Sequence, residues 1–578
     1  MDALIELITN LNRILWHEFV LYVILGVGVL FTLWSRFSQY RALTHGVDVI
    51  RGKFDDKRDP GAINHFQALS TALSATVGLG NIAGVALAVS VGGPGAVFWM
   101  WITGVVGMAL KSTEVTQALL YRDTSDPDKP HGGAMYVAKQ GFARISPMLA
   151  PLGTIVGGIF CVTLLISAVT GGNMFQAWNV ADITWSYFGV NRLMTGIILT
   201  VLVGLVIIGG IKRIGNVTGR LVPIMCLVYL LAALGVIVAE YDRIPAMFLL
   251  IFTEAFSPTE AQGAFIGGAV GWSFLKGMQR SLFSSEAGQG SAPIAHSAAK
   301  TDEPVREGVV AGLEPFIDTL CVCTITAMVI LLSGQWNREP DLVFTEPPTV
   351  VAVEGTENLW TLTPTTAVGE AHNIVEGQAV YAVVAGDLNK ERGSRHAQLS
   401  GTLQRISGDA DRSEFRIAWG SHASEIPPEL TSPGAYYSFK GATLTAKAFD
   451  RSLDGLGKWL VPLVAWMFAI STIISWSYYG EQGMVYLLGI RSVMPYRIVY
   501  CLLIFVACTP LIASEAALDE ISAMGTGVML FANIPIMLIF GRQAMRAWKD
   551  YMRRLDSGEM TGHDAPPLED VVEGRDVR

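Results

Sequence analysis

Long apolar runs dominate the chain, and polar residues gather in shorter segments between them. A helix needs about 20 apolar residues to cross a hydrocarbon core of roughly 30 Å. Eleven runs are long enough, near residues 17–37, 64–91, 95–120, 151–174, 193–211, 216–239, 259–284, 308–333, 456–488, 497–514 and 522–541. The pattern predicts an all-α polytopic membrane protein with eleven transmembrane helices.

Composition agrees with a chain whose main solvent is lipid. Of the 578 residues, 51% are hydrophobic and only 16% are charged, and the mean hydropathy is +0.42. These values are far from those of a soluble multidomain enzyme. All six cysteines fall within apolar spans, so neither a disulfide framework nor a zinc site is indicated.

Basic residues fall in every second connecting segment, which fixes an expected orientation. The positive-inside rule places such segments in the cytoplasm, and eleven crossings put the two termini on opposite sides. We therefore expect the N-terminus outside and the C-terminus in the cytoplasm. The basic segments are 36–58, 122–139, 212–213, 300–306, 491–497 and the C-terminal tail from Arg542.

One long segment, 338–447, does not belong to the bilayer. It is polar and contains alternating stretches such as AVYAVVAG, SEFRIAWG and AYYSFKGA, which predict short strands. We expect a small β-rich extracytoplasmic insert between the helices of 1–337 and those of 448–545. The sequence does not indicate a protein partner for this insert. The tail at 546–578 is expected to be cytoplasmic and partly disordered.

Two spans carry glycines where a continuous helix would avoid them. Residues 74–84 read SATVGLGNIAG, and residues 263–277 read GAFIGGAVGWSFLKG. Interrupted spans in corresponding positions of two halves indicate a secondary transporter built from inverted repeats. The broken ends expose N–H groups and carbonyls, which suit a carboxylate and a small cation.

Other functional classes find less support. The chain lacks a GxxxxGK[ST] motif, an HExxH motif and a convincing nucleophile with its base, so neither an enzyme nor an ATP-driven pump is indicated. No feature indicates a nucleic-acid partner or a cofactor other than a coupling ion. A membrane-embedded sensor that uses the β-rich insert to bind its ligand is the alternative.

Four stretches resemble the signatures of the alanine or glycine:cation symporter family. They are TVGLGNIAGVALAVSVGGPGAVFWMW at 76–101, HGGAMY at 131–136, MQRSLFSSEAGQGSAPIAHSAAKT at 278–301 and STIISWSYYGEQ at 471–482. The resemblance implies a leucine-transporter-type fold with an extra helix at 17–37, a first five-helix repeat at 64–239 and an inverted second repeat beginning at 259–333. It also implies uptake of alanine and glycine across the inner membrane, driven by Na⁺ or, in some members, H⁺. The insert departs from the usual pattern of the family.

The first broken span supplies candidates for both ligands. Gly78, Gly80, Asn81 and Thr76 are expected to meet the substrate carboxylate, although Asn81 could instead cap the following half-helix. Carbonyls of Ser74 and Val77, together with hydroxyls of Ser471 and Thr472, would make an all-oxygen Na⁺ cage. Hydroxyls in membrane helices also bond back to their own backbone, so spacing alone leaves this open.

The second broken span is expected to complete the substrate pocket. Gly267, Gly268 and Gly271 would open the backbone, and Trp272 and Trp476 would wall the side-chain pocket against larger amino acids. Phe274 is interpreted as ordinary helix packing.

Charged residues inside spans are functional hypotheses. Asp318, which lacks a basic neighbour in sequence, is a candidate for carrying a coupling proton or facing a water-filled vestibule. Glu286 is a candidate for a cytoplasmic gate that pairs with a loop arginine. Lys111 and Glu114, three residues apart, are expected to neutralise one another.

Overall fold

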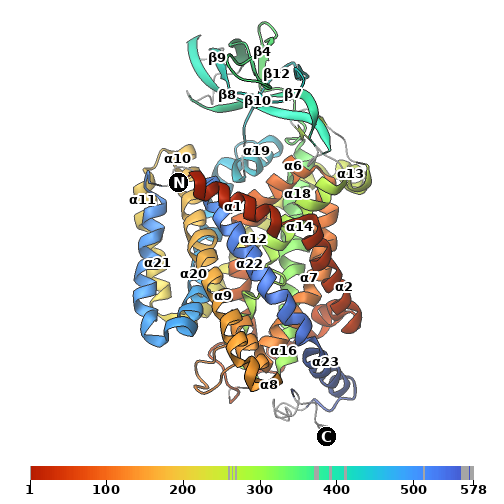
Figure 1. The fold of residues 1–578 in the computed structure, drawn as a ribbon, viewed down its shortest axis with the longest axis vertical. Helices are drawn as coiled ribbons and strands as arrows, with labels where there is room; N and C mark the ends of the chain where they lie inside the picture. The colour runs from red at the N-terminus through yellow and green to blue at the C-terminus, as the bar shows by residue number, and fades with distance from the viewer. Residues whose placement is uncertain are drawn as a thin grey trace.

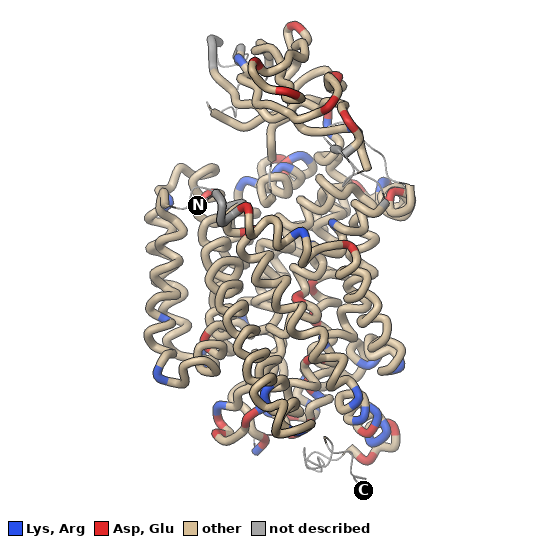
Figure 2. The backbone as a smooth tube through the Cα atoms, viewed as in Figure 1, with Lys and Arg blue, Asp and Glu red and all other residues tan. Residues whose placement is uncertain are grey.

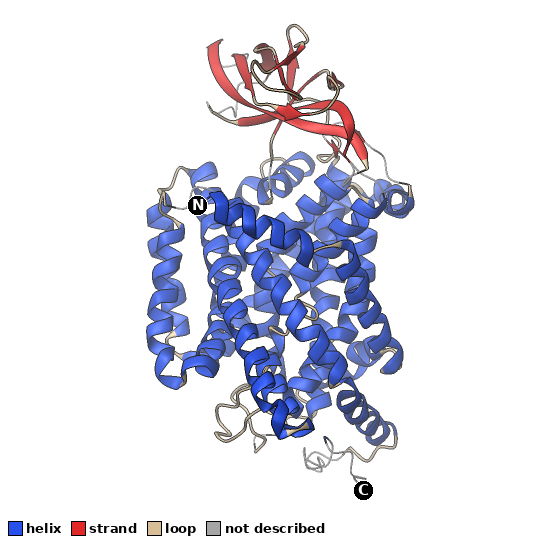
Figure 3. Ribbon diagram, viewed as in Figure 1, coloured by secondary structure: helices blue, strands red, loops and turns tan. Residues whose placement is uncertain are grey.

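A computed structural model describes residues 2–56, 58–257, 261–262, 265–266, 270–369, 377–389, 393–408, 413–439, 441–511, 515–560 and 572. The chain folds into a helical bundle with β-sheets at one end and the C-terminal helix at the other (Figure 1). Figure 3 shows that the strands gather almost entirely in this cap, so helix and strand occupy separate parts of the molecule.

The long helices follow the apolar runs. The helices are α1 Asp2–Leu15, α2 Glu18–Trp34, α3 Ser38–Arg41, α4 Val47–Ile50, α5 His65–Thr76, α6 Val85–Gly92, α7 Gly95–Leu120, α8 Ala134–Ile145, α9 Ala150–Val169, α10 Phe175–Phe188, α11 Arg192–Ile207, α12 Gly210–Ala239, α13 Ile244–Phe256, α14 Val270–Ser285, α15 Ala292–His296, α16 Pro304–Ala311, α17 Leu313–Pro315, α18 Thr324–Ser333, α19 Ala442–Ser452, α20 Gly457–Leu488, α21 Val493–Ala507, α22 Glu515–Ile539 and α23 Gly541–Asp556. Several are joined by π-helical turns, namely η1 Ala42–Gly46, η2 Gly80–Gly84, η4 Thr170–Met174 and η6 Phe316–Cys323.

By length and composition, seven helices of the described chain can cross a membrane, and nine can if each of two bent pairs counts as one span. Lysine and arginine are concentrated toward the two ends of the bundle, where a bilayer would leave them in contact with water (Figure 2). The chain is therefore a mostly helical, multi-pass membrane protein. The count of eleven crossings needs two further helices, α11 and α14, which are shorter.

The structure differs from the predicted span 259–284 at the start of that span. Two short antiparallel strands, β1 Ala261–Gln262 and β2 Phe265–Ile266, precede α14, and the helix begins only at Val270. Glycine weakens a helix by about 1 kcal/mol per residue relative to alanine, and the stretch before Val270 is rich in glycine. The apolar run is thus longer than the helix that it forms.

Helix α20 lies at the centre of the bundle and packs against α5, α9, α10 and α12. Its most apolar window is 78% buried inside the protein, whereas that of Ile490–Ala507 is only 22% buried. The buried residues of α20 include Ser471, Thr472, Ser475 and Gly480. Small residues let backbones approach closely in membranes, so this helix can line a site while its neighbours face lipid.

The cap is built from two sheets. A three-stranded sheet has the order β10-β5-β4, and a seven-stranded antiparallel sheet has the order β11-β7-β12-β3-β6-β9-β8. The strands are β3 Leu342–Phe344, β4 Val350–Ala352, β5 Leu359–Leu362, β6 Thr365–Gly369, β7 Ala379–Asn389, β8 Ser394–Gly408, β9 Ser413–Trp419, β10 His422–Ala423, β11 Glu429–Leu430 and β12 Gly434–Tyr437. The cap has its own apolar core, which includes Leu342, Val384 and Ile417.

The two chain segments that enter and leave the cap are clamped together at its base. Arg338 donates from Nη2 to the Tyr437 carbonyl at 2.8 Å and pairs with Asp341 at 3.0 Å. The Tyr437 N–H in turn donates to the Asp341 carboxylate at 2.8 Å. Beyond the clamp, Thr445 of α19 donates to the Ile82 carbonyl at 3.1 Å. The clamp closes the cap as a unit, and α19 belongs to the bundle.

We predict that the cap can be removed without unfolding the bundle. Replacing 342–436 by a short Gly/Ser linker joins two residues, Asp341 and Tyr437, that are already hydrogen-bonded. The melting temperature in detergent should stay near that of the full chain. A deletion extended to 452, which also removes α19, should lower it clearly. Equal loss of stability in both deletions would show that the cap itself supports the bundle.

Candidate functional site

The first break separates α5 from the η2–α6 segment. The two parts, His65–Thr76 and Gly80–Gly92, meet at an angle of 52°. The side chain of Asn81 accepts a hydrogen bond from the Gly78 N–H at 2.8 Å, so it satisfies a peptide group that the helix no longer bonds. Asn81 therefore holds the break from within, and the N-terminal end of η2 at Gly80 lies beside a cavity.

A second break lies at 286–291, between α14 and α15. The break predicted near 267–271 falls mostly outside the described residues. Residues of the break at 286–291 adopt left-handed backbone conformations, with φ of 54° at Glu286, 81° at Gly288 and 79° at Gly290. Side chains from two distant helices hold it. Glu114 accepts from the Gly290 N–H at 3.1 Å, and Asn533 donates to the Gly288 carbonyl at 2.9 Å.

A third irregular segment, η4, joins α9 to α10 and contains two adjacent glycines. A Cβ atom on Gly172 would lie 2.3 Å from the Trp476 ring, and one on Gly171 would lie 2.1 Å from the Ser522 hydroxyl. Glycine is required at both positions because α20 and α22 approach so closely. The two glycines therefore allow Trp476 and Ser522 to lie in the same space as the two breaks.

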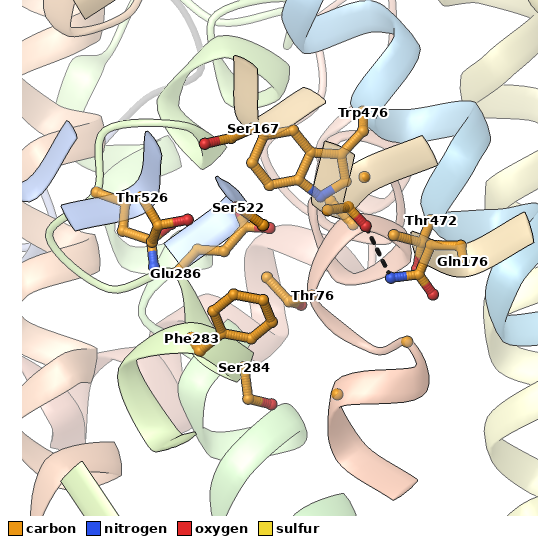
Figure 4. Close-up of a pocket in the computed structure, with 16 residues that line it drawn as sticks. Thr76, Ser167, Gln176, Phe283, Ser284, Glu286, Thr472, Trp476, Ser522 and Thr526 are labelled. Atoms are coloured by element: carbon orange, nitrogen blue, oxygen red, sulfur yellow. Dashed lines mark hydrogen bonds between the residues drawn. The ribbon is translucent and has the colours of Figure 1, made fainter. Parts of the chain in front are cut away.

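A small cavity of about 40 Å³ lies where the three irregular segments meet (Figure 4). One water molecule needs roughly 10–15 Å³ of such space, so the cavity fits only a small ligand. It is lined by Ala75, Thr76, Gly78, Gly80, Ser167, Gly171, Gly172, Gln176, Phe283, Ser284, Glu286, Gln289, Thr472, Trp476, Ser522 and Thr526. Trp476 and Phe283 provide its large apolar walls.

Two fully buried polar atoms of the lining have no hydrogen-bond partner among the described residues. They are Oε1 of Gln176 and Oγ of Ser167, and both side chains are more than nine-tenths buried. The Gln176 amide nitrogen is already used, since it donates to the Gly171 carbonyl at 3.0 Å (Figure 4). A buried acceptor without a partner costs roughly 1–3 kcal/mol, so these atoms suit a polar ligand.

Beside the cavity, oxygens of α5 and α20 form a cluster. The Ser74 carbonyl accepts from Thr472 Oγ1 at 3.1 Å and from Ser471 Oγ at 3.5 Å, while Ser74 Oγ donates to the Ser471 carbonyl at 2.7 Å. Val77, the residue at the break, is fully buried next to them. Three of the four residues expected for a Na⁺ cage thus share direct hydrogen bonds, in an all-oxygen set that fits a hard cation.

Asp318 does not line the cavity, but it is hydrogen-bonded to Ser284, which does. It is fully buried, and its carboxylate accepts hydrogen bonds from Asn81, from Ser284 Oγ at 3.0 Å and from Thr319 Oγ1 at 2.8 Å. No ion pair to Asp318 is found in the described part of the chain. Through Asn81, this carboxylate is connected directly to the first break.

The remaining predicted site residues lie elsewhere. Gly267 and Gly268 fall outside the described residues. Trp272 donates from its ring nitrogen to the Val91 carbonyl at 3.0 Å, and the space beside Gly271 faces Glu18 of α2. The structure therefore does not bring Gly271 and Trp272 to the cavity, where Phe283 takes the place expected for Trp272. Phe274 stacks on Tyr22 at 4.8 Å, as a packing residue does.

Two of the predicted charged residues have partners that differ from those expected. Glu286 lines the cavity and accepts from Ser291 Oγ at 2.5 Å, so its carboxylate faces the candidate site. Lys111 lies 3.8 Å from Glu114 and closer, at 3.2 Å, to Glu314 of α17. The expected Lys111–Glu114 pair is part of a larger buried group of charges.

Sequence reasoning missed the η4 glycine pair and the polar lining on α9, α10 and α22. The signal available was the TGGN stretch at 170–173, in which adjacent glycines interrupt an apolar span much as Gly78 and Gly80 do. The side chains that it positions, such as Gln176 and Ser522, carry no signal of their own.

Comparison with known proteins identifies the family. The sequence profile described as "Sodium:alanine symporter family" matches residues 1–353 and 430–565. The chain belongs to the sodium:alanine symporter family. The segment that the profile leaves out, 354–429, lies within the β-sheet cap, so the cap is the part in which this symporter-family protein departs from the shared pattern.

Relatives within the family carry more than one substrate name. The chain is 34% identical to the sodium/alanine symporter AgcS of Methanococcus maripaludis, over 93% of this chain and 95% of that protein. It is also 34% identical to the probable sodium/glutamine symporter GlnT of Bacillus subtilis, over 58% of this chain and 68% of that protein. A solved structure of a mutant manganese transporter from Eremococcus coleocola aligns with a TM-score of 0.44 at 13% identity, covering 90% of this chain and 96% of that chain.

We predict that Gly78→Ala disrupts the oxygen cluster through a single methyl group. A Cβ atom there would lie 2.6 Å from Thr472 Oγ1, and such overpacking costs about 1–3 kcal/mol. The melting temperature in detergent should fall, and adding Thr472→Ala should recover most of the loss.

Gly80→Ala is the matched control, because its Cβ atom would meet only Phe283, at 4.0 Å. It should change the melting temperature little. Equal melting temperatures for Gly78→Ala and Gly80→Ala would contradict the assigned contact.

Proposed function

We propose that this member of the sodium:alanine symporter family carries out Na⁺-coupled symport of small amino acids, alanine and glycine first, into the cell by alternating access. The observation that supports the proposal is a small cavity at the junction of two helix breaks, with an oxygen cluster beside it. Broken helices around a central site are the architecture that secondary transporters use to bind amino acids and ions.

The cavity offers a complementary group to each end of an amino acid. The helix N-terminus at Gly80 favours the carboxylate, with Gly78 and Thr76 beside it. The ammonium would meet Oε1 of Gln176 and the Glu286 carboxylate. Asn81 contributes by holding the turn at Gly78 and not by lining the cavity.

The size and walls of the cavity favour a short side chain. Trp476 packs against Gly172 and Phe283 against the space near Gly80, so neither wall can recede without moving a helix. One methylene discriminates by about 1–3 kcal/mol in such a pocket. Alanine and glycine fit this space better than glutamine, which a relative's name mentions.

The coupling Na⁺ would bind among the Ser74 and Val77 carbonyls and the Ser471 and Thr472 hydroxyls. Binding there would tie α5, which ends at the first break, to the central helix α20. Asp318 is a second place where a coupling cation, Na⁺ or H⁺, would be favoured, because its buried carboxylate is bonded only to neutral donors. No other cofactor enters the proposal.

We further propose that α11 and α14 complete eleven crossings of the inner membrane. The extra helix at 17–37, the first repeat at 64–239 and the second repeat from 259 would then follow the inverted-repeat plan of the leucine-transporter-type fold. The β-sheet cap and the N-terminus would lie outside. The basic helix α23 and the C-terminus would lie in the cytoplasm, as the distribution of lysine and arginine favours.

The experiment that tests the function is uptake of labelled alanine, glycine and glutamine into proteoliposomes with an inward Na⁺ gradient, an inward proton gradient or neither. We expect alanine and glycine to accumulate above equilibrium only with the Na⁺ gradient. Collapse of that gradient with an ionophore should stop accumulation. Binding without accumulation under any gradient would favour a sensor instead.

Thr472→Val tests the Na⁺ site. The change replaces a ligand oxygen by a methyl group at similar volume, so the Na⁺ concentration for half-maximal alanine uptake should rise about tenfold or more, as the loss of a charge-assisted contact worth roughly 1.5–3 kcal/mol implies.

The matched control is Thr163→Val, because the Thr163 hydroxyl bonds only carbonyls of its own helix α9, at 3.0 Å and 3.1 Å. Its Na⁺ dependence should match that of the unmodified protein. An unchanged Na⁺ dependence in Thr472→Val would remove this residue from the cage.

A further inference from the structure

A series of titratable side chains runs through the end of the bundle that carries α23. It is hydrogen-bonded from His65 to Glu314, and contacts between charged groups of 3.2–4.0 Å extend it at both ends. It consists of Asp55, His65, Glu307, His296, Glu314, Lys111 and Glu114. Six of the seven are no more than 3% exposed. They come from the segment before α5 and from helices α5, α7, α15, α16 and α17, so only the fold brings them into one row.

His296 is bonded to a carboxylate on each side of its ring. Nδ1 lies 2.5 Å from Glu307 Oε1, and Nε2 lies 2.6 Å from Glu314 Oε1. A neutral imidazole has one N–H only, so two such contacts require an additional proton, on the ring or on one of the carboxyl groups. The Glu307–His296–Glu314 unit therefore holds a proton that can change places among its members.

One end of the series opens toward water. His65 Nδ1 is hydrogen-bonded to Glu307 Oε2, and its other ring nitrogen lies 4.0 Å from Asp55, whose side chain is 40% exposed. The neighbouring residue Phe54 contacts His45, which in turn bonds Tyr551 of α23 at 2.8 Å. This end of the series therefore lies at the proposed cytoplasmic end of the protein.

The other end reaches the cavity. Lys111 Nζ lies 3.2 Å from Glu314, and the carboxylates that act on its charge also include Glu114 and Glu286. Glu114 bonds the Gly290 N–H of the second break, and Glu286 belongs to the same break and lines the cavity. The Lys111 ammonium thus interacts with carboxylates of and around the second break, and one of these, Glu286, is proposed to meet the substrate ammonium.

The positive charges on neighbouring elements are too few to neutralise the buried glutamates. Arg122 faces Glu307 and donates to backbone carbonyls of 297–301, and the Tyr479 phenol faces the glutamates near the cavity. Farther out, Arg306 lies near Asp59, which Asp302 also faces. Four buried glutamates (Glu114, Glu286, Glu307 and Glu314) face two cations, Lys111 and Arg122, so neutrality requires additional bound protons.

We propose that this series is a proton path from the cytoplasm to Glu286, and that one proton leaves the cell for each amino acid that enters. The inference rests on the proposed symport and extends it with a counter-transported proton. The path contacts water through Asp55 at the proposed cytoplasmic end. A cytoplasmic proton therefore reaches the cavity while the substrate is released to the cytoplasm.

The transfer conserves protons at every step. Lys111 gives a proton to Glu286, which becomes neutral and releases the substrate ammonium. Lys111 then regains a proton from Glu314, which takes one from His296 on the side opposite to Glu307. Glu307 and His65 return the proton to His296 from Asp55 and cytoplasmic water. After the cavity opens outward, Glu286 loses its proton to external water and can bind the next ammonium.

The test uses full-length protein in proteoliposomes loaded with a pH-sensitive dye, with an inward Na⁺ gradient and the membrane potential clamped. Addition of alanine should raise the internal pH at a rate that follows alanine uptake. An unchanged or falling internal pH together with normal Na⁺-driven uptake would overturn the proton path and leave the symport intact. Absence of Na⁺-driven uptake itself would instead overturn the proposed function.

His296→Gln should abolish the alanine-dependent pH rise while Na⁺-dependent alanine binding remains. His45→Gln is the matched control, because His45 is also a buried, hydrogen-bonded histidine at this end but lies outside the series; it should keep the full pH response. A full pH response in His296→Gln would overturn the path.

Asp55→Asn provides the measurement if His296→Gln fails to fold. Its side chain is half-exposed, so folding should be unaffected, and the pH rise per alanine should slow. A pH response in Asp55→Asn equal to that of the unmodified protein would overturn the assigned entry.

Discussion

A peptide group inside a bilayer must find a hydrogen-bond partner within the protein, because no water is available to replace one. Each break in a helix therefore needs a side chain that takes over the bonds that the helix gives up. Asn81 does this for the Gly78 N–H, while Glu114 and Asn533 do it for the turn at 288–290. The rest of the site depends on these three side chains.

The same side chains connect the breaks to buried charge. The amide nitrogen of Asn81 bonds Asp318, and the carboxylate of Glu114 faces Lys111. A change of ionisation at either charged group consequently acts on the side chain that holds a break. In each half of the site, a single residue thus connects a buried charge to a helix break, so the proposed binding of a cation would act directly on a helix end.

The sequence predicted the helical membrane architecture and the family, both of which are confirmed, because apolar runs and long motifs are local signals. The first break was also visible, since Gly78 and Gly80 interrupt an apolar run. The break at 286–291 was not predicted, because glycine content was the only guide and pointed to Gly267–Gly271, which lies mostly outside the described residues. The turn at Glu286 is imposed by partners on α7 and α22 that lie far away in sequence. Likewise, Gln176 lines the cavity only because η4 brings α9, α10 and α20 together, and Phe283 of α14 does so only because it meets Gly80 of the first break.

The buried charges themselves argue for function over stability. Taking an ion pair out of water costs several kcal/mol per ion, and apolar residues of similar volume often stabilise a protein more. Apolar core residues such as Ala295, Val310 and Leu313 surround Glu307, His296 and Glu314, so apolar packing is the main source of stability at this place. A set of groups that is costly to bury, contacts a carboxylate on each side of one imidazole and extends from a half-exposed aspartate toward the candidate cavity is best explained by the protons that it can carry.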